Sequence, residues 1–137
     1  MYTHTHTPTR PHTQVLVLNL KRFMQTARGR MRKVDQFVRF PRTLDVSPFC
    51  HQESGEGADA CVYELYGLVE HHGSLSGGHY VAYVAAEDSD GEEGGETRSG
   101  RQWYYFSDTQ VKRVDEAKVL SREAYILFYR RVTKGAG

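Results

Sequence analysis

The chain has 137 residues, a size that suits one ordinary domain, and its 39% hydrophobic and 26% charged residues are typical of a folded globular protein. A formal net charge of +1 excludes a general electrostatic attraction to nucleic acid or to an anionic membrane. The two cysteines, Cys50 and Cys61, are too few for a secreted disulfide scaffold or a four-cysteine zinc site. We therefore expect an intracellular protein of the cytoplasm and/or nucleus, without a membrane span.

The first part of the chain is predicted to hold a leader, one buried strand and irregular segments. Residues 1–13 are a low-complexity tract of Thr, His and Pro, for which we predict a disordered leader. The apolar, β-branched residues 14–23 predict a strand that is largely buried on both faces. Residues 25–32, with a glycine and three arginines, predict an exposed turn, and residues 34–40 a second strand or an extended segment. The polar residues 49–60 predict a surface loop.

The rest of the chain is predicted to consist mainly of strands. Residues 62–71 and 79–86 are rich in aromatic and β-branched side chains, and the loop of residues 72–78 separates these two predicted strands. Residues 87–100 form an acidic, glycine-containing insert that predicts a solvated hairpin extension. Asp115 is predicted to N-cap one or two helical turns. The remaining predicted elements are strands at residues 102–108, 111–114 and 124–132, and a polar tail at residues 133–137.

This succession of short strands indicates the fold class. Strands with at most one short helix predict an α+β fold that is mostly antiparallel β. Because such sheets twist and curl, we expect a strongly twisted sheet or a partial barrel.

A histidine that follows two glycines is the strongest candidate for chemistry. Gly77 and Gly78 permit a close backbone approach, and His79 is then predicted at the first position of a strand, where a general base could face a cleft. Ser107 and Asp108 end another aromatic strand. If these two strands pair through the acidic insert, His79 lies across from Ser107 and Asp108. An imidazole oriented by a polar side chain is half of a nucleophile–base–orienter arrangement, although an ordinary surface or core histidine is the alternative.

A nucleophile is not evident from the residues alone. No serine lies in a G-x-S-x-G setting. Cys50 and Cys61 lie in or beside a polar loop, with no evident helix N-terminus to activate a thiol. The residues therefore predict half of a catalytic site.

Five motifs occur in an order that identifies a family. They are LVLNLKRF, VRFPRTLDVSPF, YELYGLVEHHGSLSGGHYVAYV, WYYFSD and EAYILFYRR. Over about residues 14–132 this order closely resembles the C-terminal part of the catalytic domain of the ubiquitin-specific proteases, which are papain-like cysteine deubiquitinases. The resemblance implies the β-rich half of a papain-like fold, with the helical half missing.

The resemblance also implies a reaction and roles for particular residues. The family hydrolyses the isopeptide or peptide bond after the C-terminal glycine of ubiquitin, and its GGHY histidine, here His79, accepts the thiol proton of a cysteine. By the same resemblance, the ubiquitin tail is bound by residues of the GGHY motif and by two histidines before it, here Gly77, Gly78, Tyr80, His71 and His72. Residues 71–76 and 49–60 correspond to the family's blocking loops over that tail.

The third member of the catalytic triad departs from the usual family pattern. The family usually has Asp or Asn directly after the last aromatic residue of the strand and then Asp, whereas this chain has Ser107 and Asp108. The departure resembles a minority subgroup with a Cys-His-Ser triad. We expect the Ser107 hydroxyl to accept the Nδ1–H hydrogen bond of His79. Asp108 then supports the site or is itself the third member.

Parts of the family pattern have no counterpart in this sequence. The cysteine box and the paired CxxC motifs of the zinc-bearing fingers are absent. We therefore expect a fragment that needs a missing N-terminal half, is inactive alone, binds ubiquitin and ubiquitinated proteins, and uses no cofactor. The competing hypothesis is a non-catalytic ubiquitin-binding module. A weaker one is a metal site made of His51, His71, His72 and the cysteines, and the basic residues 21–33 are interpreted as a solvated face rather than a nucleic-acid site.

Overall fold

The computed structural model describes residues 13–49, 61–87 and 101–132. Most of the predicted leader, of the loop at 49–60, of the acidic insert and of the tail lies outside these residues. The strands of the described part are β1 (Val15–Asn19), β2 (Phe23–Gln25), β3 (Met31–Lys33), β4 (Thr43–Asp45), β5 (Val62–Ser74), β6 (Gly77–Glu87), β7 (Arg101–Ser107), β8 (Gln110–Val114) and β9 (Ala124–Arg131). The short 3-10 helix η1 (Ser47–Phe49) follows β4, and the helix α1 (Glu116–Leu120) lies between β8 and β9.

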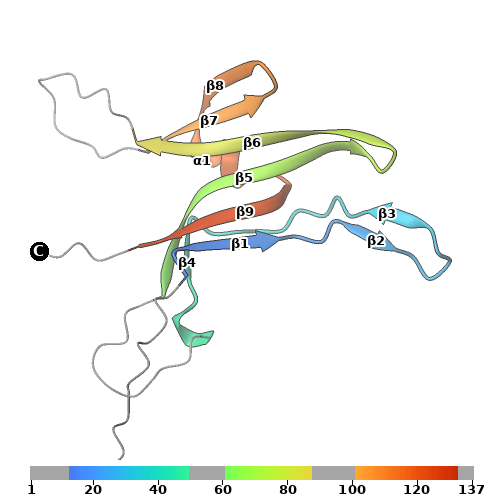
Figure 1. The fold of residues 1–137 in the computed structure, drawn as a ribbon, viewed down its shortest axis with the longest axis horizontal. Helices are drawn as coiled ribbons and strands as arrows, with labels where there is room; N and C mark the ends of the chain where they lie inside the picture. The colour runs from blue at the N-terminus through green and yellow to red at the C-terminus, as the bar shows by residue number, and fades with distance from the viewer. Residues whose placement is uncertain (1–12, 50–60, 88–100, 133–137) are drawn as a thin grey trace, which may run out of the picture.

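One twisted antiparallel sheet forms the body of the molecule (Figure 1). Its strand order is β1-β9-β5-β6-β7-β8, and β4 also pairs with β5. The strands β2 and β3 form a separate hairpin. The predicted fold class, mostly antiparallel β with little helix, is confirmed, and the sheet is open rather than closed into a barrel.

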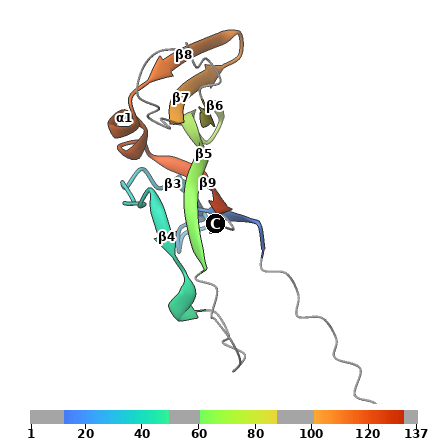
Figure 2. The same ribbon diagram turned by 90° about the vertical axis from the view of Figure 1, so that its left-hand side faces the viewer.

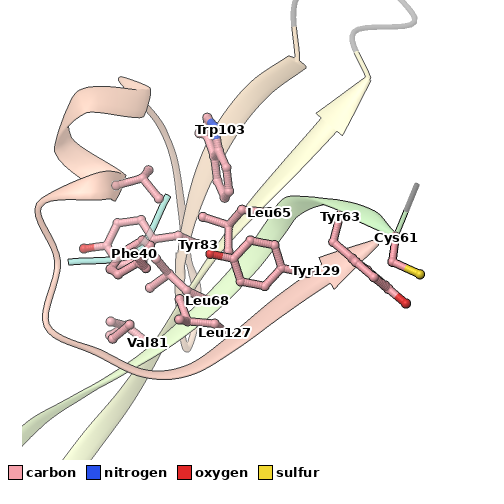
Figure 3. Close-up of a cluster of buried hydrophobic side chains, with 12 residues drawn as sticks. Phe40, Cys61, Tyr63, Leu65, Leu68, Val81, Tyr83, Trp103, Leu127 and Tyr129 are labelled. Atoms are coloured by element: carbon pink, nitrogen blue, oxygen red, sulfur yellow. The ribbon is translucent and has the colours of Figure 1, made fainter. Parts of the chain in front are cut away.

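The core lies on one face of this sheet. The register places Leu127 of β9 beside Leu68 of β5, and Leu68 beside Tyr83 of β6; these side chains are at most 3% exposed. Phe40 and Val119 complete the same cluster from outside the sheet. Helix α1 and strand β4 lie on the same side of β5 in Figure 2, and Figure 3 shows the clustered side chains. Burial of this apolar area is the main source of stability for the fold.

Tyr129 ties the segment before β4 to the centre of the core. Its ring is fully buried, and its hydroxyl donates a hydrogen bond to the carbonyl oxygen of Pro41 at 2.7 Å. Burial raises the pKa of Tyr129 to about 12, because the phenolate would lose its hydration. The buried phenol is thus a neutral donor that holds Phe40 against the sheet.

The first strand differs from its prediction. The predicted strand at 14–23, buried on both faces, is shorter and one-sided: Leu16 and Leu18 pack against the core, whereas Val15 and Val17 are 43% and 51% exposed. Among the described strands β1 pairs with β9 alone, so it is an edge strand with one covered face. The prediction was wrong because an apolar run does not reveal whether a second layer covers both faces.

The predicted turn at 25–32 is the tip of the β2–β3 hairpin. Only residues 26–30 turn, with the Thr26 N–H donating to the Arg30 carbonyl at 2.8 Å and Gly29 at φ 75°. The predicted helix is present as α1, with Asp115 in the N-cap position. However, the Asp115 side chain makes no capping hydrogen bond, and the helix starts on the backbone bond from Lys118 N–H to the Asp115 carbonyl.

Candidate functional site

The candidate site lies on a part of the β5–β6 hairpin that extends beyond the main sheet. β5 pairs with β9 only as far as Glu70, and β6 pairs with β7 only from Ala82 onward. Beyond these points β5 and β6 pair with each other alone, and we call this segment, residues 71–80, the ribbon. It projects past the sheet in Figure 1.

The ribbon replaces the predicted loop of residues 72–78. Strand pairing continues to Ser74 and Gly77, so only Leu75 and Ser76 form the turn. His79 is therefore the third residue of β6, paired with His72, and not the first residue of a strand. The prediction was wrong because glycine and serine were interpreted as loop formers, whereas this two-residue hairpin keeps them in the ladder.

The predicted contact between His79 and Ser107 is present in the structure. The antiparallel pairing of β6 and β7 brings the start of β6 to the end of β7, and the His79 Nε2 atom lies 2.7 Å from the Ser107 Oγ atom. The nitrogen involved is Nε2 and not the predicted Nδ1. The His79 side chain is 43% exposed. The Nδ1 atom, on the other side of the His79 ring, does not contact Ser107.

Asp108 makes a longer contact with the same histidine. Its Oδ2 atom is 3.7 Å from His79 Nε2, beyond hydrogen-bond distance, and its side chain is 80% exposed. Its backbone has φ 43°, and it is the one non-glycine residue with positive φ in the described part of the chain. This left-handed residue begins the turn between β7 and β8. Water screens an ion pair this exposed, so Ser107 is the stronger partner of His79 in this geometry.

A second polar contact lies on the β5 side of His79. His72 Nε2 is 3.2 Å from the Oε2 atom of Glu70, whose side chain is only 8% exposed. Glu70 also accepts hydrogen bonds from the Tyr83 hydroxyl at 3.5 Å and the Glu123 N–H at 3.4 Å. Sequence reasoning missed Glu70, although an acidic residue inside an aromatic strand was a signal.

The opposite face of the ribbon holds an aromatic cluster. The His71 ring lies 4.7 Å from the Tyr80 ring and 5.4 Å from the Phe23 ring, and Tyr125 contacts both Phe23 and Tyr80. His71 is buried, whereas Tyr80 is 54% exposed. Phe23 and Tyr125 were not predicted to belong to the site, because they come from segments far from the GGHY motif.

The two glycines before His79 differ in their surroundings. A Cβ atom added at Gly78 would collide with the imidazole of His71 and lie 2.7 Å from the His72 carbonyl oxygen. A Cβ atom added at Gly77 would meet nothing within 4 Å. The fold therefore requires a glycine at position 78, whereas the space beside Gly77 is open.

Comparisons with known proteins agree with this geometry. The family model described as ubiquitin carboxyl-terminal hydrolase matches residues 9–129, most of the chain. This chain belongs to the ubiquitin carboxyl-terminal hydrolase family. It is 40% identical over 131 residues to ubiquitin carboxyl-terminal hydrolase 16 of Danio rerio, and 40% identical over 134 residues to ubiquitin carboxyl-terminal hydrolase 45 of Homo sapiens. The alignments cover 87% and 86% of this chain but only 16% of each relative.

Solved structures of the family share the fold. The structure of the SAGA Ubp8/Sgf11/Sus1/Sgf73 DUB module bound to ubiquitin aldehyde matches with a TM-score of 0.71 at 35% identity, over 88% of this chain and 25% of that chain. A structure of the yeast SAGA DUB module that carries a mutant Sgf73 also matches with a TM-score of 0.71, at 34% identity over 88% of this chain and 25% of that chain. The family resemblance that the sequence motifs indicated is confirmed.

Cys61, the cysteine within the described residues, lies far from His79. Cys61 is 3% exposed and directly precedes β5, whereas His72, the partner of His79, lies near the far end of that strand. At about 3.3 Å per residue along a strand, the two positions are on the order of 30 Å apart. Cys50 lies outside the described residues. A buried thiol at this distance cannot exchange a proton with His79.

Two features are absent from the described residues: a cluster of metal ligands and a membrane-spanning helix. Within residues 13–49, 61–87 and 101–132, no three His, Cys, Asp or Glu side chains gather closely enough to hold a metal ion. His51, one of the ligands of the weaker metal-site hypothesis, lies outside these ranges. In the same part of the chain, no helix has the length and apolar character that crossing a bilayer demands.

Proposed function

We propose that this chain supplies the histidine-bearing part of a cysteine-type deubiquitinase that cleaves after the C-terminal glycine of ubiquitin. The observation that carries the proposal is the 2.7 Å contact between His79 Nε2 and Ser107 Oγ. This contact joins the glycine-containing ribbon to β7 in a chain of the ubiquitin carboxyl-terminal hydrolase family. Because the chain spans 16% of the relatives' length, further residues complete the enzyme.

In this proposal His79 is the general base and later the general acid. Its Nδ1 atom accepts the proton of a cysteine thiol, and the thiolate attacks the carbonyl carbon of the ubiquitin C-terminal glycine. The imidazolium then gives its proton to the leaving lysine amine as the carbon–nitrogen bond breaks, and water hydrolyses the thioester. A neutral imidazole with Nδ1 unprotonated carries its hydrogen on Nε2. The Ser107 oxygen is placed to accept that hydrogen, which selects the active tautomer.

Asp108 has a supporting role in the proposal. A serine hydroxyl fixes the ring but carries no charge to stabilise the imidazolium. The Asp108 carboxylate, 3.7 Å from Nε2, supplies a negative charge next to it. The high exposure of that carboxylate limits its contribution.

The ubiquitin tail is proposed to pass beside the ribbon. The open space at Gly77 leaves room for a second backbone, and Gly78 lets the His71 ring pack beneath it. Tyr80 and His72, each about half exposed, flank this path from the two faces of the ribbon. We therefore assign Gly77, Gly78, Tyr80, His71 and His72 to tail binding.

A chimera tests the assignment of the third triad member. Residues 9–129 replace the matching segment of human ubiquitin carboxyl-terminal hydrolase 45, and hydrolysis of a fluorogenic ubiquitin C-terminal amide is measured. We expect His79→Ala to lower kcat by about 10²–10⁴-fold, the usual contribution of general acid–base catalysis. Ser107→Ala should lower kcat by less, with KM unchanged, and Asp108→Ala least. Loss of turnover in Asp108→Ala alone would exchange the two roles.

The distance between Cys61 and His79 also supports a second candidate function, a non-catalytic ubiquitin-binding module. Both functions predict that the 137-residue chain alone hydrolyses no ubiquitin substrate. Turnover that survives alanine at both Cys50 and Cys61 would contradict both. Titration of ¹⁵N-labelled ubiquitin with the chain separates them: saturable binding together with an inactive chimera would favour the module.

A further inference from the structure

The ribbon that carries the candidate site has little intrinsic stability. Residues 71–80 form a two-stranded segment without a neighbouring strand of the main sheet on either side. An isolated two-stranded hairpin is marginally stable in water. Gly73, Gly77 and Gly78 add backbone freedom to it. Ser107 of β7 holds the His79 side chain, but the ribbon backbone needs support beyond the strand ladder of the main sheet.

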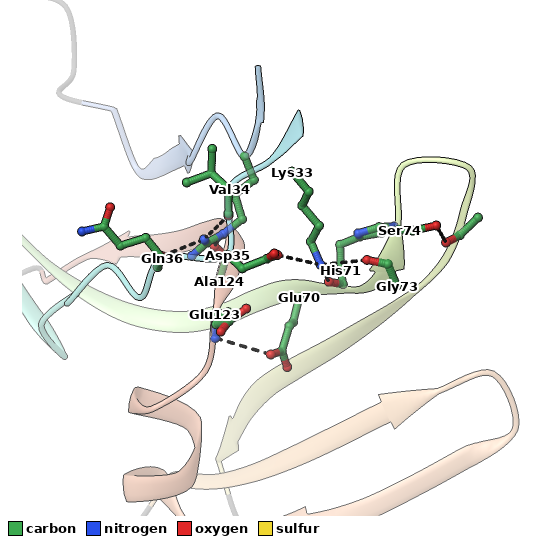
Figure 4. A network of polar contacts seen from close by, with 12 residues as sticks. Lys33, Val34, Asp35, Gln36, Glu70, His71, Gly73, Ser74, Glu123 and Ala124 are labelled. Atoms are coloured by element: carbon green, nitrogen blue, oxygen red, sulfur yellow. Dashed lines mark hydrogen bonds and ion pairs between the residues drawn. The ribbon is translucent and has the colours of Figure 1, made fainter. Parts of the chain in front are cut away.

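The β2–β3 hairpin lies beside the ribbon in Figure 1, and its residues Phe23 and Lys33 contact the ribbon. Phe23 and Lys33 are register partners across this hairpin. The Phe23 ring meets the His71 ring edge-on at 5.4 Å. The Lys33 ammonium donates hydrogen bonds to the carbonyl oxygens of His71 and Gly73, each at 3.0 Å, as drawn in Figure 4.

The geometry of the strand explains why one ammonium can bind both carbonyls. The carbonyls of alternate residues point to the same edge of a strand. For His71 and Gly73 this is the edge of β5 that β9 covers only as far as Glu70. The side chain of Lys33 is 15% exposed, and its Nζ atom also lies 3.3 Å from Asp35. Lys33 thus takes the place of the missing strand with charge-assisted hydrogen bonds.

The same end of the β2–β3 hairpin, next to Phe23 and Lys33, is anchored to the main sheet by Arg22. This side chain is 4% exposed, and its Nε atom donates to the Ala124 carbonyl at 2.6 Å. Its Nη1 atom donates to the carbonyls of Val34 and Gln36, each at 2.9 Å. Ala124 pairs with Glu70, the residue directly before the ribbon. Two residues of the basic stretch interpreted as a solvated face are therefore structural.

We propose that the β2–β3 hairpin is a brace for the ribbon and that Lys33 is the positioning residue that fixes His79 for its reaction. The effect of the brace on catalysis rests on the proposed function, whereas the bracing of the ribbon does not. Lys33 makes no contact with the His79 side chain, and among the residues assigned to tail binding it binds only the backbone carbonyl of His71. It acts by holding the backbone of β5 opposite the segment of β6 that carries His79.

Three variants of the full chain test the brace. Lys33→Met removes the ammonium but keeps the length of the side chain, Lys33→Arg retains a cationic donor, and Lys21→Met removes an exposed lysine of the same stretch. Native-state hydrogen exchange is measured for the ribbon amides and for Leu127 in the core. The ¹H–¹⁵N signals of the His79 imidazole report the tautomer and the Ser107 contact.

We expect Lys33→Met to accelerate exchange of the ribbon amides by about tenfold or more and to shift the His79 signals, with exchange at Leu127 unchanged. Lys33→Arg should restore most of the protection, and Lys21→Met should match the original chain. Unchanged ribbon exchange, or equal acceleration at Leu127, would overturn the brace.

The catalytic consequence is measured in the chimera. Lys33→Met should lower kcat there, and Lys33→Arg should recover it. Full activity in Lys33→Met together with a loosened ribbon would overturn the positioning role. An inactive unsubstituted chimera would instead contradict the proposed function, and the exchange data would still decide the brace.

Discussion

The strands β5 and β6 pass through two very different surroundings. Inside the sheet they carry side chains such as Leu65 and Tyr83, which are 1% and 3% exposed. In the ribbon the same ladder carries three exposed glycines and the half-exposed His79. The pairing of β5 with β6 is continuous across the boundary, but the ribbon lacks the further strands and the buried side chains that stabilise the sheet region. The lower burial leaves ribbon residues such as His79 exposed.

The largest expected effect is in the sheet region. Leu65→Ala removes a fully buried side chain and leaves a cavity, so the free energy of unfolding should fall by about 2–5 kcal/mol. Urea unfolding followed by the fluorescence of Trp103, the one tryptophan, measures it. Val84→Ala, at a position 36% exposed on β6, is the control and should cost clearly less. If both variants lost the same free energy of unfolding, burial would not explain the difference between the two faces of the sheet.

A pH titration tests the same buried region. The pKa of Tyr129 is about 12 in the folded chain, against 10 when exposed, so the unfolded state loses this proton first. Stability should therefore fall as pH rises from 10 to 12, by up to about 2–3 kcal/mol from this group. Thermal unfolding at about pH 9, 10 and 11 measures the slope. Tyr129→Phe should reduce the dependence of stability on pH. The dependence that remains in this variant includes a contribution from Tyr83, because burial also raises the pKa of Tyr83. An unchanged slope would contradict the assignment.

In the ribbon, Gly78→Ala should have a moderate and local effect. The added Cβ atom collides with the His71 ring, and overpacking of this kind costs about 1–3 kcal/mol. Because the collision lies outside the main sheet, exchange of the β9 amides should not change while the ribbon amides exchange faster. Binding of ¹⁵N-labelled ubiquitin should be lost. Retained binding would contradict the need for the His71 packing.

Gly77→Ala is the matched control and has the smallest expected effect on folding. Its Cβ atom enters open space, so the free energy of unfolding should change by less than about 0.5 kcal/mol. The same methyl group occupies the proposed tail path, so ubiquitin binding should still weaken. Unaltered affinity for ubiquitin would remove Gly77 from the tail path without affecting the packing at Gly78.

The features that the sequence predicted are those set by local pattern. The aromatic and β-branched runs located β5, β6, β7 and β9, and a hairpin between β6 and β7 was enough to bring His79 to Ser107. The ribbon was not predictable, because it depends on where β9 and β7 stop pairing. The brace depends on contacts between Lys33 and residues 38 and 40 positions away. Which ring nitrogen meets Ser107 depends on the side-chain rotamer, which no residue pattern contains.

The position of β9 also constrains how the chain can fold as it is made. β9 lies between β1 and β5, and Arg131 N–H donates to the Gln14 carbonyl at 2.8 Å, which joins the two ends of the described chain. Of the described elements, β9 is the last to leave the ribosome. Until residues 124–131 emerge, β1 has no partner strand and β5 has an open edge, and such edges invite pairing with other chains. The nascent chain therefore exposes these unpaired edges until β9 is complete.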